Sequence, residues 1–152
     1  MQVYDDDHIN DHQIAVNLFN SFGIPLERKR YFTVFSDSSG GYIMTANHFV
    51  PYGIKNINGQ QYFLDYYGIY KLIDAAADYT FHNNEAGRSV IFVNDTNKQL
   101  FMGEWPSGRP LKSMEVTTAP EARHSELIYM YAADNQLNPA RNRKEKKQQS
   151  SR

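Results

Sequence analysis

The chain has 152 residues, a length that suits one domain with its own core and leaves little room for two. It contains no cysteine, which excludes a disulfide framework, a cysteine-ligated zinc site and a cysteine nucleophile. Residues 141–152 hold six basic side chains against Glu145, a net charge of +5, while the remainder holds ten basic and sixteen acidic side chains, a net charge of −6. We therefore expect an acidic body with a basic tail.

The first nine residues, MQVYDDDHI, are polar and acidic. We expect a flexible acidic N-terminus over residues 1–9. Because the segment lacks a basic region and an apolar run, we do not expect it to be a secretory signal. No apolar run in the chain is long enough to span a bilayer. These observations predict a cytoplasmic protein without a membrane partner.

A first helix is expected after Asn10 or Asp11, since either side chain can accept from the free amides of a helix start. An apolar stripe at helical spacing follows and consists of Ile14, Ala15, Leu18, Phe19 and Phe22. Gly23 and Pro25 end the helix, because glycine tolerates the closing conformation and proline resists continuation.

Two hairpins are predicted next. Strands over residues 30–36 and 42–49 flank a turn cluster that contains Gly40 and Gly41. Strands over residues 53–57 and 60–65 flank Asn58-Gly59, the pair that suits a tight hairpin turn.

The triplet Gly68-Ile69-Tyr70 resembles the first half of the signature of the GIY-YIG endonucleases. The resemblance stops there, because no Tyr-Ile-Gly half occurs in the chain. The apolar positions around the triplet recur in steps of three and four, and the alanine run 75–77 favours helix. The sequence therefore predicts a helix over residues 67–81 and indicates no family.

Beyond this helix, we expect a hairpin with strands over 89–93 and 99–103, and a short strand within 112–118. A last helix over about 121–136 would turn Leu127, Ile128, Tyr131 and Ala132 inward, and Pro139 would mark its boundary with a disordered tail. The element order is α-β-β-β-β-α-β-β-(β)-α. It predicts one α+β domain over residues 10–138, with three helices and a mostly antiparallel sheet built from hairpins, followed by a tail over residues 139–152.

Motifs for catalysis are missing, so catalytic residues stay unknown and we expect neither cofactor nor metal. His8 and His12 are four residues apart but lack a third ligand. Whether His48, His82 or His124 belongs to a site stays open.

We expect a small non-catalytic binding protein of the inhibitor, immunity-protein, escort-chaperone or adaptor type, with an acidic, tyrosine-rich face for a protein partner. The candidate contact residues are Tyr66, Tyr67, Tyr70 and Trp105. Trp105 fits either an exposed anchor or a core position. Two alternatives stay open besides a homodimer: an enzyme acting on a nucleotide or phosphodiester, and a nucleic-acid accessory protein. The second would use the tail residues Arg141, Arg143, Lys144, Lys146 and Lys147.

Overall fold

The computed structural model describes residues 1–52, 63–94 and 96–121. The strands are β1 Gln2–Tyr4, β2 Tyr31–Val34, β3 Asp37–Ser39, β4 Tyr42–Met44 and β5 Glu115–Thr117. The α-helices are α1 His12–Ser21, α2 Lys71–His82, α3 Glu85–Ile91 and α4 Asn97–Leu100. Short 3-10 turns form η1 Leu26–Arg28 and η2 Val50–Tyr52, and a π-helical segment, η3 Leu64–Tyr70, leads into α2.

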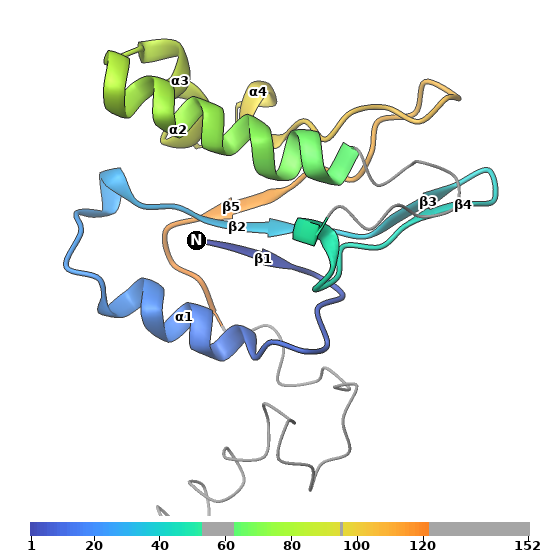
Figure 1. The fold of residues 1–152 in the computed structure, drawn as a ribbon, viewed down its shortest axis with the longest axis horizontal. Coiled ribbons are helices and arrows are strands. Elements are labelled where there is room, and N and C mark those ends of the chain that lie inside the picture. Colours follow the sequence, from blue (N-terminus) through green and yellow to red (C-terminus); the bar gives the residue numbers. More distant parts are fainter. Residues whose placement is uncertain (53–62, 95, 122–152) are drawn as a thin grey trace, which may run out of the picture.

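The described elements form three layers. A three-stranded sheet, ordered β1-β2-β5, lies between α1 on one face and the α2–α3 pair on the other (Figure 1). The two faces follow from the alternation of side chains along β2: Phe32 and Val34 join the core under α2, while Tyr31 packs with α1. Helices and strands together confirm the α+β class.

The expectation of a flexible segment over residues 1–9 is wrong for β1. This strand pairs in parallel with β2, with Val3 opposite Thr33, and both Val3 and Tyr4 are buried. The two side chains point to opposite faces of the sheet, so each contributes to a different core cluster. A parallel pair needs a crossover between its strands, and α1 provides it, so this part of the sheet is not built from hairpins.

The start of α1 is confirmed, since Asp11 Oδ1 accepts a hydrogen bond from the amide of Gln13 at 2.9 Å. The inward face of the helix differs from the predicted stripe. Val16 and Phe19 are buried, whereas Ile14 and Leu18 are exposed. The buried side of α1 is therefore rotated away from the predicted stripe.

The predicted strand over 30–36 is confirmed as β2, but its partner is different. β2 pairs antiparallel with β5, which lies within the short strand predicted over 112–118. The glycine turn is confirmed, because Gly40 and Gly41 have φ of 58° and 82°. It joins the short hairpin β3–β4, which replaces the longer strands that were expected.

The predicted helix over 67–81 is confirmed within η3 and α2. Asn83, with φ of 53°, ends it in the left-handed region. The strand expected over 60–65 is wrong for Leu64 and Asp65, which lie in η3. The rest of the Asn58-Gly59 hairpin, over residues 53–62, lies outside the described residues.

The hairpin expected over 89–103 is also wrong, because α3 and α4 occupy this region. Asn84 and Thr96 cap the two helices, accepting from the amides of Ala86 and Gln99. At Gly87, a Cβ atom would lie 2.5 Å from the carbonyl oxygen of Ala75, so glycine allows α3 to press against α2. The helix predicted over 121–136 and the tail over 139–152 lie outside the described residues, apart from Glu121.

Candidate functional site

One side of the continuous helix formed by η3 and α2 carries a row of apolar side chains. We call this row the outer stripe; it consists of Tyr66, Tyr70, Ile73, Ala77 and Phe81. All but Ala77 are exposed, with exposed fractions from 56% to 79%. Steps of three and four residues keep side chains on one helix face, and Leu72 and Ala75 fill the opposite face against the sheet. The outer stripe therefore points away from the core.

Acidic side chains lie next to the outer stripe. Asp74 is exposed, directly beside Ile73. Asp78 lies one turn further along α2, where its carboxylate accepts from the Asn84 side chain at 3.0 Å and contacts His82 Nδ1 at 3.0 Å. Asp78 thus helps to end α2, whereas Asp74 adds a negative charge to the apolar surface.

The other aromatic residues predicted for the contact face are packed against the protein itself. Tyr67 is half-buried and lies parallel to the ring of Phe63, with centroids 6.2 Å apart, and edge-on to Phe101 at 5.2 Å. Trp105 is only 3% exposed and belongs to the core under α2. Of the four predicted contact residues, Tyr66 and Tyr70 are therefore the two at the surface.

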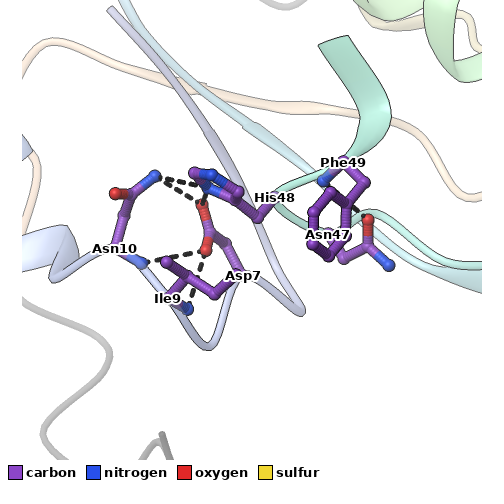
Figure 2. Close-up of polar contacts among 6 residues, drawn as sticks. All are labelled: Asp7, Ile9, Asn10, Asn47, His48 and Phe49. Carbon is purple, nitrogen blue, oxygen red and sulfur yellow. Dashed lines mark hydrogen bonds and ion pairs between the residues drawn. The ribbon is translucent and has the colours of Figure 1, made fainter. Parts of the chain in front are cut away.

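A second cluster joins the loop after β1 to the turn before η2 (Figure 2). Asp7 Oδ1 accepts from the backbone amides of Ile9 and Asn10 at 2.9 and 3.0 Å, and Oδ2 accepts from Asn10 Nδ2 at 2.9 Å. His48 Nδ1 lies 3.4 Å from the same Oδ2. Burial alone raises the pKa of the Asp7 carboxyl, but these hydrogen bonds and the nearby His48 ring outweigh it and lower the pKa below its usual value.

The hydrogen bonds of this cluster give Asp7 a structural role in the loop after β1. An ionised carboxylate accepts hydrogen bonds but cannot donate them, so the side of the Asn10 amide that faces Asp7 must be the NH₂ group. The same nitrogen lies 2.9 Å from His48 Nδ1, so the three side chains form one polar network. The cluster thus supports the reading of Asp7 and Asn10 as a turn that positions His48.

The remaining histidines do not assemble a site with one another in the described part of the chain. His12 is buried in α1, while His8 lies before the helix with Nε2 4.0 Å from Asp6 Oδ1. Among residues 1–52, 63–94 and 96–121, no three metal-ligating side chains gather closely enough to hold an ion. His124 and the basic residues from Arg141 onward lie outside these ranges.

Sequence reasoning missed Asp7, Asn10 and His48 as a cluster. A local signal existed, because an Asp side chain that accepts from amides two and three residues later is a common turn. The partner 41 residues away had no such signal. It also missed Phe81 as part of the exposed row, although Phe81 follows Ala77 by four residues, the same helical spacing as the apolar positions around Gly68-Ile69-Tyr70.

None of the helices in the described ranges has the length and apolar character needed to cross a bilayer. Comparisons with protein-family models, with curated proteins and with solved structures give no match for this chain, so a function has to be argued from its own geometry.

Proposed function

We propose that this chain is a non-catalytic binding protein that holds a protein partner against the outer stripe. The observation that carries the proposal is the exposure of four large apolar side chains in one row, Tyr66, Tyr70, Ile73 and Phe81. A contiguous apolar surface that is exposed to water is typical of an interaction site. Tyrosine is enriched at such sites because it combines apolar contact area with a polar hydroxyl.

The row also suggests the chemistry of the partner. From residue 66 to residue 81 a helix rises by about 22 Å, enough to contact several turns of a partner helix or an extended segment. Asp74 lies beside the row, and the body as a whole is acidic. A segment with apolar side chains flanked by lysine or arginine would complement both properties.

The proposal belongs to the class of inhibitors, immunity proteins, escort chaperones and adaptors, which act by occupying a partner. An enzyme acting on a nucleotide or phosphodiester stays the weaker alternative.

A pair of variants tests the outer stripe. A partner would first be isolated with the tagged full chain from its own host, and its affinity then measured by calorimetry. Changing Tyr66 and Tyr70 together to Ala should weaken binding by about 30-fold or more, because the loss of even one central aromatic contact costs about 2 kcal/mol. Tyr42→Ala is the matched control, since Tyr42 is 42% exposed on β4, away from the row. Unchanged affinity in the double variant, with the fold intact, would reject the outer stripe as the contact surface.

A charge variant tests the partner's chemistry independently. Asp74→Lys should slow association with a basic partner and weaken the dependence of the rate on added salt, because rim charges act mainly through electrostatic steering. If the partner associates equally fast with the parent chain and with Asp74→Lys, its basic charge does not contribute to recognition.

A second candidate function rests on the charge of the tail. Its net charge of +5 opposes the body's −6, and basic segments bind nucleic-acid phosphates through counterion release. In that case the tail residues, not the outer stripe, would carry the activity.

A further inference from the structure

The solvent side of α1 and the turn that follows it form an unusual surface. From His12 to Leu26 the chain contains no Asp, Glu, Lys or Arg. Five large apolar side chains in this stretch have exposed fractions from 45% to 58%. We call them the α1 apolar face: Ile14, Leu18, Phe22, Ile24 and Leu26. A helix that borders water normally carries charged residues on its outer side, so this face is built to be covered.

A hollow adjoins the α1 apolar face. Its volume is about 390 Å³, and it lies between α1 and β1. Ile14, Ala15 and Leu18 line it from the helix, and Val3 lines it from the strand. Asp7 and Asp11 also line it, but they are only 4% and 8% exposed and already accept from backbone amides. A ridge of aliphatic side chains would therefore cover the hollow with little further loss of carboxylate hydration.

The chain leaves the described fold on the same side of the sheet. Glu121 borders a small hollow with Tyr31 and Thr33, and the ring of Tyr31 packs edge-on against Phe19 of α1, with centroids 5.8 Å apart. Figure 1 shows the end of the described chain running from β5 past α1. The residues after Glu121 thus begin on the sheet face that α1 covers, opposite the outer stripe.

The sequence that follows matches the uncovered face. Between residues 127 and 139 the single charged side chain is Asp134. Apolar side chains recur there at helical spacing: Leu127, Ile128, Tyr131 and Ala132. The six residues from Glu121 to Leu127 can span about 20 Å, more than the width of a helix. They are long enough for the segment to pass around α1.

We infer that residues 127–138 dock onto the α1 apolar face as an amphipathic helix and fill the hollow between α1 and β1. The residues of the α1 apolar face are uncharged, and residues 127–138 contain Asp134 as their one charged side chain, so little ion hydration is lost when the two meet. The short tether raises the local concentration of the segment to the millimolar range, which favours it over a partner in solution. The outer stripe, which lies behind the sheet, stays available for another protein.

Paired cysteines test the contact in the full chain, and the lack of natural cysteine makes the result unambiguous. Leu18→Cys is combined with Tyr131→Cys, and in the matched control with Ala133→Cys, which lies on the other side of the expected helix. Under mild oxidation the first pair should form a disulfide within one chain, at least about tenfold faster than the control pair, since the bond requires close Cα atoms. Equal rates for the two pairs would overturn the inference.

Hydrogen exchange of the unmodified full chain gives a second, independent readout. The amides of residues 127–137 should exchange at least about tenfold more slowly than in an unfolded chain, and Leu18→Asp should remove this protection. Sedimentation should show a monomer for both proteins. Unprotected amides in the parent, or a dimer that Leu18→Asp dissociates, would overturn the inference, and the second outcome would assign the face to another copy of the chain.

Discussion

The indole Nε1 of Trp105 donates to Asp37 Oδ2 at 2.9 Å, across 68 residues of sequence. The same carboxylate accepts from the Arg109 guanidinium at 2.9 and 3.0 Å and from the amide of Lys112 at 3.0 Å. One side chain at the start of the β3–β4 hairpin thus fixes the loop that leads to β5. Burial alone raises the pKa of the Asp37 carboxyl, but the hydrogen bonds from Trp105, Arg109 and the backbone outweigh it and lower the pKa.

Asp37→Ala should destabilise the protein by about 2–4 kcal/mol, because it leaves the buried indole N–H without its acceptor and removes the carboxylate that pairs with Arg109. In a domain of this size the melting temperature should fall by about 5–12 °C. Trp105 is the sole tryptophan, so its fluorescence reports directly on the change. Asp74→Ala, at an exposed position, is the control and should melt within about 1 °C of the parent. A similar melting temperature for the two variants would mean that the loop does not depend on Asp37.

Gly103→Ala should cost about 2 kcal/mol or more. The backbone there has φ of 94°, and an added Cβ would lie 2.6 Å from Phe63 Cδ1 and 2.7 Å from Tyr67 Cε2. Gly23→Ala is the matched control, since Gly23 lacks a positive φ and a Cβ there meets no atom within 4 Å. The control should be neutral or slightly stabilising, and the reverse order in chemical denaturation would contradict the packing of the Phe63–Tyr67 pair on Gly103.

The sequence predicted those parts of the fold whose signals are local. The cap at Asp11, the turn at Gly40 and Gly41, and the helix from Tyr67 to Phe81 depend on neighbours a few residues away, and all three are confirmed. Strand β2 was placed correctly for the same reason, because its residues favour extended backbone.

The errors concern choices that tertiary contacts decide. Residues 89–91 have strand propensity, but Gly87 lets α3 pack closely on α2, and burial of Ile91 outweighs the local preference. The parallel pairing of β1 depends on a strand about 30 residues away. For the candidate site, spacing predicted a row of side chains, but it could not tell which face points outward. Trp105 was ambiguous in sequence, because its partner Asp37 is distant.

Asp65→Asn should stabilise the protein at neutral pH by about 1 kcal/mol. Asp65 is buried in η3, burial raises the pKa of its carboxyl, and Oδ1 has no hydrogen-bond partner among the described residues. A raised pKa means that the folded state loses stability as the pH rises through it, so the gain should shrink near pH 3. Equal unfolding free energies for variant and parent at pH 7 would show that the charged form is tolerated.

Stability should depend on pH in two opposite steps on the alkaline side. Burial lowers the pKa of Lys71 to about 8, while its Nζ donates to the carbonyls of Gln99 and Phe101. Between pH 8 and about 10 the unfolded chain binds the additional proton, so the free energy of unfolding should rise with pH. Burial also raises the pKa of Tyr4 and of Tyr31 to about 12, so above about pH 10 the unfolded state releases protons first and stability should fall.

Urea unfolding at intervals from pH 7 to pH 11 measures this profile. In Lys71→Met the rise between pH 8 and pH 10 should be absent, while the fall above pH 10 should remain. A rise that persists in the variant would assign the first step to another group.

The last prediction separates the two candidate functions. If the tail is the functional element, binding to DNA or RNA should be measurable at low salt and should weaken steeply as salt is added. Up to about five phosphate contacts would give a slope of log affinity against log salt of up to about −4.5 on duplex DNA, reduced by repulsion from the acidic body. Changing Arg141, Arg143, Lys144, Lys146 and Lys147 to Gln should abolish any such binding. We expect the same variant to keep its protein partner, since the outer stripe lies on η3 and α2 and is unchanged, and circular dichroism should confirm an intact fold. Loss of the biological activity in a correctly folded Gln variant, with Tyr66 and Tyr70 unchanged, would show that the tail carries the function and the outer stripe does not.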